Sequence, residues 1–182
     1  MQNPSHDIIE VVALLAGAVT PDIQKAAFDK FVLRNAGFRH PLVSVAPGRG
    51  SRDTILGIYQ WYRVMSPELE IRVNHVVYDR ETNVLICDIS QKFHIRFNPL
   101  PPAWSQLLVR LTLTEADDGL HYIAFQEDFY HPDDFTNLIL PILSPFVRVG
   151  LAVTAQVSTV SARVAQVLGV WRTDAPVSVK HD

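Results

Sequence analysis

The sequence predicts an α+β protein in which helices precede and follow a sheet of antiparallel hairpins. Two observations predict this order. Apolar residues recur every three or four positions up to about residue 62, the period of a helix face, and then at every second position from 69 to 130, the period of a strand. The chain has 182 residues, 48% of them hydrophobic, which is enough to bury the core of one compact domain.

Three helices are expected before the sheet. The first is broken by Gly17, and the second starts at Thr20-Pro21, a capping hydroxyl followed by proline at the first helical position. The stripe of the second helix continues to Arg34, and Asn35-Ala36-Gly37 ends it. Ser51 caps the third helix. The inward faces of the three helices carry the following residues: Ile8, Val11, Val12 and Leu15; Ile23, Ala27, Phe31 and Arg34; Ile55, Ile58, Tyr59 and Tyr62.

Two hairpins form the predicted sheet, with strands at 69–77 and 85–97, then at 107–114 and 121–130. Alternation places Gln91, Phe93 and Val109 on the covered face. The chain is expected to be a single domain over 1–182, with a core at about 20–135 and a C-terminal helical segment at about 136–172.

Composition excludes several classes of function. A net charge of −3 and a pI near 6.1 leave no basic face for a nucleic acid. The single cysteine, Cys87, rules out a disulfide framework, and the histidines show no metal-ligand spacing. The N-terminus does not have the pattern of a signal peptide, so we expect a cytoplasmic protein. Neither a dinucleotide fingerprint nor a P-loop occurs, and we expect the protein to use neither metal nor cofactor.

The apolar segment from Leu138 to Trp171 is the one feature that suggests a membrane. Arg148 and Arg163 interrupt it, whereas a spanning helix needs about 20 predominantly apolar residues. We expect a helix that packs on the domain or at a dimer interface. Peripheral membrane contact remains open.

Four polar residues occupy positions where the period predicts an apolar side chain: Arg34, His75, Gln91 and Glu127. Glu127 lies between Phe125 and Phe129, so its carboxylate is expected to enter the space between the sheet and the helices. Buried groups of this kind have shifted pKa values and can transfer protons without a cofactor. The alternative is a buried structural ion pair between Glu127 and Arg34.

Other polar residues are weaker candidates. Asp128 should face away from the core unless a bulge intervenes. Asp128 and His40 are the second-choice catalytic residues. His75 taken alone is more often a hydrogen-bonded core histidine. Tyr59 and Tyr62 are expected in the core, with hydroxyls that can reach a ligand.

This order of elements, closing on the strand Tyr122–Tyr130, resembles the SnoaL-like superfamily, which has the cone-shaped fold of nuclear transport factor 2, ketosteroid isomerase and scytalone dehydratase. The resemblance spans about residues 20–172. The block Gln126-Glu127-Asp128, the dipeptide His131-Pro132 and the apolar C-terminal helix are most similar to a fungal sigma-factor-F-like branch. That branch occurs in secondary-metabolite gene clusters and includes a cofactor-free semipinacolase that acts on oxidised indole alkaloids.

The resemblance implies a pocket inside the cone, a homodimer, and Arg34 with Glu127 as the catalytic pair. Val109 replaces a tyrosine of the family's pocket, and the aspartate dyads of scytalone dehydratase and the limonene epoxide hydrolases have no counterpart. The leading hypothesis is a cofactor-independent isomerase or cyclase of a hydrophobic secondary metabolite. The expected binding residues are His75, Gln91, Tyr59, Tyr62, Phe93, Val109 and Phe125. The alternative is a non-catalytic ligand-binding or dimerisation module of the same fold.

Overall fold

The computed structural model describes residues 1–96 and 99–170. The chain divides into two compact units, Met1–Ser144 and a second that begins at Pro145. The first unit contains every strand of the described residues and the helices that cover the sheet, and the second contains most of the last helix. The predicted strand at 85–97 includes Phe97, and the predicted C-terminal helical segment includes residues 171–172. These residues lie outside the described part of the chain.

The three N-terminal helices begin with the signals that the sequence carries. They are α1 (Pro4–Ala16), α2 (Pro21–Phe31) and α3 (Ser51–Met65). Pro4 and Pro21 occupy first helical positions, and the Thr20 hydroxyl accepts a hydrogen bond from the Ile23 N–H. The cap of α3 is Gly50, with φ of 78°, rather than Ser51.

The second helix ends earlier than the sequence analysis placed it. It stops at Phe31, and the next residues form β1 (Val32–His40). Arg34 therefore lies on a strand, where it is exposed, and not in the last turn of a helix. β1 pairs with the last strand at Val32 and again from Gly37 to Arg39, and this tertiary pairing overrides the local helical pattern.

The six strands form one mixed sheet in the order β2-β1-β6-β5-β4-β3. The remaining strands are β2 (Val43–Val45), β3 (Glu70–Asp79), β4 (Val84–Lys92), β5 (Trp104–Glu115) and β6 (His121–Phe129). Every neighbouring pair is antiparallel except β1 and β6, which are parallel. The predicted strand at 85–97 ends at Lys92.

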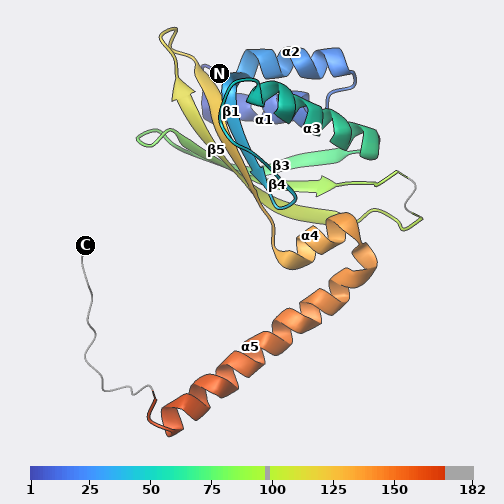
Figure 1. Ribbon diagram of the computed structural model, residues 1–182, viewed down its shortest axis with the longest axis vertical. Coiled ribbons are helices and arrows are strands. Elements are labelled where there is room, and N and C mark those ends of the chain that lie inside the picture. The colour runs from blue at the N-terminus through green and yellow to red at the C-terminus, as the bar shows by residue number, and fades with distance from the viewer. Residues whose placement is uncertain (97–98, 171–182) are drawn as a thin grey trace. The chain divides into compact units, whose positions relative to one another are not determined.

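Helices α1, α2 and α3 lie over one face of the curved sheet (Figure 1). Ile8 and Val11 of α1 pack with Phe28 of α2 and with inward residues of β4 and β5, so the core includes the first helix. After β6 the chain continues through α4 (Pro132–Ile139), the short 3-10 helix η1 (Pro141–Leu143) and α5 (Ser144–Val167). The fold is therefore the α+β arrangement that the sequence predicts, with a curved sheet, covering helices and a C-terminal helix.

Two bulges decide which face the polar residues of the sheet occupy. In β6, Ile123 is paired with Leu113 and Phe125 with Thr112, so Ala124 is an extra residue. In β3, Val73 is paired with Ile89 and His75 with Asp88, which makes Asn74 extra. Because side chains alternate, one extra residue reverses the facing of everything that follows it.

Candidate functional site

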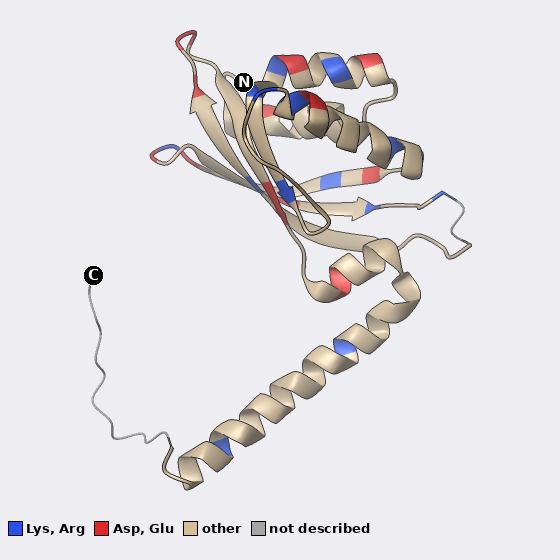
Figure 2. Cartoon of the chain, viewed as in Figure 1, with Lys and Arg blue, Asp and Glu red and all other residues tan. Residues whose placement is uncertain are grey.

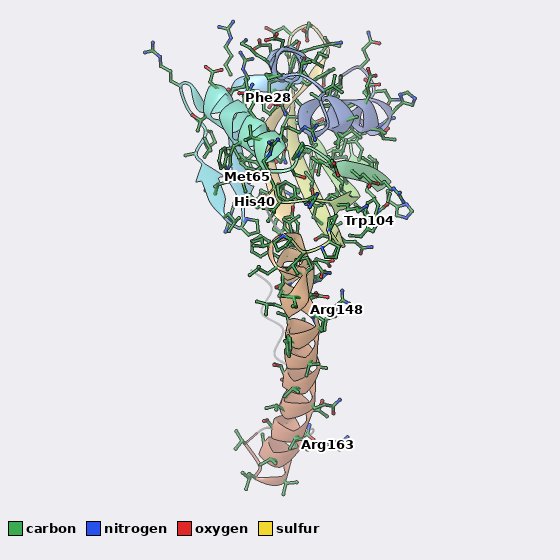
Figure 3. The ribbon with its side chains drawn as sticks, turned by 90° about the vertical axis from the view of Figure 1, so that its right-hand side faces the viewer. Phe28, His40, Met65, Trp104, Arg148 and Arg163 are labelled. Carbon is green, nitrogen blue, oxygen red and sulfur yellow. The ribbon has the colours of Figure 1, made fainter. Side chains whose placement is uncertain are left out.

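A cavity of about 280 Å³ lies between the inner face of the sheet and helices α1, α3 and α4. Most of its wall is aliphatic or aromatic. Seven polar side chains also line it: His40, Tyr59, Tyr62, Gln91, Gln126, Asp128 and Tyr130. A mostly apolar cavity with a few polar groups is the usual form of a small-molecule site. Figure 3 labels His40 on β1 and Met65 at the end of α3, which both line it.

Asp128 is the acidic residue of this wall. The bulge at Ala124 turns Gln126, Asp128 and Tyr130 inward. Gln126 donates from Nε2 to Oδ1 of Asp128 at 2.8 Å, and its Oε1 accepts from the Tyr59 hydroxyl at 2.9 Å. Burial disfavours the carboxylate and raises the pKa of Asp128 from 3.8 to about 7, although the Gln126 hydrogen bond opposes this shift.

His40 supplies a neutral imidazole to the same wall. It follows Arg39 on β1, and Arg39 is paired with Glu127 on the parallel strand β6. Asp128 follows Glu127, so His40 and Asp128 occupy corresponding positions on the two strands. Burial lowers the pKa of His40 to about 4. Its Nδ1 is 3.2 Å from the Leu42 N–H and accepts from it, so we assign the ring proton to Nε2.

Three tyrosines complete the polar end of the cavity. The Tyr130 hydroxyl accepts a hydrogen bond from Gln91 Nε2 at 2.7 Å. The Tyr62 hydroxyl is buried without a hydrogen-bond partner among the described residues, and burial together with the nearby Asp128 raises its pKa to about 12. An unsatisfied buried hydroxyl is costly, and in a cavity wall it is a ready donor to a ligand oxygen.

Among the described residues, the cavity wall contains no lysine or arginine. An anionic ligand would therefore meet Asp128 without a compensating cation, so the wall favours a neutral ligand or one that carries an amine. No group of three or more histidine, cysteine or acidic side chains in residues 1–96 and 99–170 could hold a metal ion.

The structure brings together seven of the residues that the sequence analysis selected. The cavity is lined by His40, Tyr59, Tyr62, Gln91, Phe93, Val109 and Asp128. Four selected residues lie elsewhere: Arg34, His75, Phe125 and Glu127. His75 is exposed because the extra residue Asn74 turns it to the outer face. The ring of Phe125 lies against Gly37, where an added Cβ would be only 2.3 Å from it.

The expected position of Glu127 is wrong, because the bulge at Ala124 places this side chain on the outer face of the sheet. It forms an ion pair with Arg110 of β5 at 2.8 Å and lies 4.0 Å from Arg39 of β1. Its two partners are the residues directly opposite it on the neighbouring strands. Arg34 lies on exposed backbone near Asp29, so the predicted Glu127–Arg34 pair is not formed.

Gln126 and Tyr130 are site residues that the sequence analysis missed. An alternation that runs unbroken through Ala124 turns both outward together with Asp128. No residue type in Ile123-Ala124-Phe125 marks a bulge. Gly37, which gives Phe125 room on the outer side, is a contact between distant segments that becomes visible only in the fold.

The chain belongs to the SigF NTF2-like domain family, whose pattern matches residues 1–170. No protein of curated function matches the sequence. Several solved structures share the fold at low identity. One is an LEH-like epoxide hydrolase of M. tuberculosis, with 15% identity, a TM-score of 0.52 and coverage of 80% of this chain and 99% of that one.

Two further structures are similar. The epoxide hydrolase/cyclase-like enzyme SalBIII, which has a role in pyran ring formation in the polyether salinomycin, has 19% identity and a TM-score of 0.51, covering 74% of this chain and 97% of its own. A hypothetical protein of Catenulispora acidiphila with a ketosteroid isomerase-like fold, in complex with trimethylamine, has 15% identity and a TM-score of 0.51, covering 69% and 88%. At these identities the likeness shows the fold alone.

Proposed function

We propose that this protein is a cofactor-independent isomerase or cyclase that uses Asp128 as its general acid and base. The observation that carries the proposal is a carboxyl group with a pKa of about 7 at the polar end of an apolar cavity. A catalytic group works best when its pKa lies near the working pH, because both protonation states are then available. The proposal gives this role to Asp128 rather than Glu127, because the Glu127 side chain faces outward and pairs with Arg110.

The surrounding groups suit the transfer of a proton within a neutral substrate. Asp128 as carboxylate removes a proton from a carbon or hydroxyl, and the same carboxyl returns it to another atom of the substrate, so the reaction is a net isomerisation. The Tyr62 hydroxyl and the His40 Nε2–H are the donors that would stabilise negative charge developing on a substrate oxygen. Gln126 and Tyr59 hold the carboxyl in place.

The resemblance to the fungal branch supports a more specific proposal, a semipinacol-type rearrangement of an oxidised indole alkaloid in the cytoplasm. In such a step the substrate hydroxyl loses its proton to Asp128 while a carbon substituent migrates and a carbonyl forms. Tyr62 or His40 would hydrogen-bond the atom that receives the electrons, and the carboxyl of Asp128 would return its proton to that atom, so that the site ends in its starting state. Membership of the SigF NTF2-like family and the enzymes among the solved relatives support the class of reaction.

A matched pair of variants tests the proposal. Asp128→Asn and Glu127→Gln make the same change at adjacent positions of β6, one facing the cavity and one facing outward. The probe is 5-nitrobenzisoxazole, a neutral molecule whose ring opens when a desolvated base removes one proton. We expect wild-type and E127Q protein to open the ring at similar rates, which should rise with pH with a midpoint near 7. The rate of D128N should be at least about 100-fold lower. Equal rates for D128N and wild type would favour the non-catalytic binding module.

A homodimer is proposed through the outer face of the sheet. Four large apolar side chains of this face are exposed: Val77 on β3, Ile86 on β4, Leu108 on β5 and Phe129 on β6. Exposed apolar patches of this kind mark association surfaces. Sedimentation equilibrium should show a dimer that Leu108→Asp dissociates. A monomeric wild-type protein would contradict this.

A further inference from the structure

The last helix, α5, presents a continuous apolar stripe. Its exposed residues Phe146, Val149, Val153, Val157, Val160 and Val164 are spaced three or four positions apart. At 100° per residue these side chains fall within about 80° of the helix circumference. α5 is also the one helix of the described residues that is long and apolar enough to be considered a candidate membrane span, and only 6% of that apolar window is buried.

The composition of α5 indicates that something must cover this stripe. Seven of its 24 residues are valine and two are threonine, all β-branched and poor helix formers in water. Isolated helices of this length depend on packing of an apolar face for most of their stability. A valine-rich helix with an open stripe therefore implies an apolar surface that receives it.

The charges on α5 indicate which kind of surface covers its valine stripe. Between Pro145 and Val170 there are two arginines, Arg148 and Arg163, and no acidic residue. In Figure 2 the charged positions on the helix are all blue, and in Figure 3 the two labelled arginines project from the same side of it. Neither arginine falls within the valine stripe. A basic helix with an uncharged apolar face suits the interface of a membrane that contains anionic lipid.

The spacing of the arginines argues against a helix that crosses the bilayer. The uncharged run from Val149 to Ala162 has 14 residues. At 1.5 Å per residue it is about 21 Å long, whereas the hydrocarbon core is about 30 Å thick. A crossing helix would have to draw at least one arginine into the hydrocarbon. A helix that lies in the plane of the surface keeps both arginines among the headgroups.

A second copy of α5 is the competing occupant, because the valines from 153 to 164 also fit a coiled-coil seam. Two copies would bring together two Arg163 side chains and no acidic residue of the described helix, whereas anionic lipid supplies negative charge. We propose that α5 binds the surface of an anionic phospholipid bilayer, with the valine stripe in the acyl boundary and Arg163 among the headgroups. This inference does not depend on the proposed reaction.

Flotation of the full chain with vesicles tests the inference. The vesicles are phosphatidylcholine alone, or phosphatidylcholine with about one-quarter phosphatidylserine to give a negative surface potential. We expect wild-type protein to float with the anionic vesicles, and salt to weaken the binding. Arg163→Gln should lower the partition coefficient about fivefold. The double variant Val157→Asn/Val160→Asn should lower it at least about 100-fold, because two buried valines are lost.

The matched control is Ala155→Asn/Thr159→Asn, which places two asparagines on the side of α5 away from the stripe. This variant should bind the anionic vesicles like wild type. Four results would overturn the inference. The first three are absence of wild-type flotation, equal binding by the two double variants, and a lipid-free dimer that the V157N/V160N change alone dissociates. Resistance of the membrane-bound protein to alkaline carbonate would also overturn it, because that result indicates a spanning helix.

Discussion

The Gln126 side chain donates a hydrogen bond to Asp128 at 2.8 Å, from two residues earlier on the same strand. Both side chains face the cavity because the strand is regular after its bulge at Ala124. The Tyr59 hydroxyl from α3 donates to the other end of the Gln126 amide, at 2.9 Å, and fixes its orientation. The acid is thus held by a chain of hydrogen bonds that connects the sheet to the covering helix.

Asp128 should make folding stability depend on pH. Its folded pKa of about 7 lies above the ordinary 3.8. Its contribution to the free energy of unfolding is therefore fully present below about pH 3.8 and is lost as the pH rises through 7. At about 1.4 kcal/mol per pKa unit, the loss relative to D128N can reach about 4 kcal/mol. Urea unfolding of both proteins across this range measures it, and parallel curves would show that the carboxyl is not buried as described.

His40 should act in the opposite direction. Its folded pKa of about 4 is below the ordinary 6.5, so its contribution is present above 6.5 and is lost as the pH falls through 4. The His40→Gln variant should therefore lose less stability than wild type on acidification. The NMR signals of the ring should show no titration between about pH 5 and 8, and a midpoint near 6.5 would contradict the buried neutral imidazole.

Substitutions of Tyr62 and Tyr59 should differ in their effects on turnover and on the free energy of unfolding. Tyr62→Phe removes a hydroxyl without a hydrogen-bond partner among the described residues, so the free energy of unfolding should be unchanged or slightly higher. Tyr59→Phe breaks the bond to Gln126 and should cost about 1 kcal/mol. Turnover of 5-nitrobenzisoxazole should fall in Y62F despite its stability. A Y62F protein as unstable as Y59F would mean that the hydroxyl has a structural partner.

Gly37 is expected to tolerate no side chain. A Cβ there would lie 2.3 Å from the Phe125 ring and 2.8 Å from Pro47. Gly37→Ala should destabilise the protein by about 1–3 kcal/mol, the usual range for overpacking. Adding Phe125→Leu should recover part of this loss, as a double-mutant cycle by thermal unfolding would show. Additive effects of the two changes would exclude the close contact.

The amino-acid sequence by itself determined the order of helices and hairpins, the α+β class and the inward positions of Tyr59, Tyr62, Gln91 and Val109. Each of these follows from local periodicity and capping. Only the tertiary structure decided the face of Glu127, His75 and Asp128, and the strand that carries Arg34. A bulge is set by pairing with the neighbouring strand, and β1 is a strand because it pairs with β2 and β6, so neither feature is encoded in a local pattern. The single extra residue Ala124 in β6 places Asp128 in the cavity and Glu127 on the outer face.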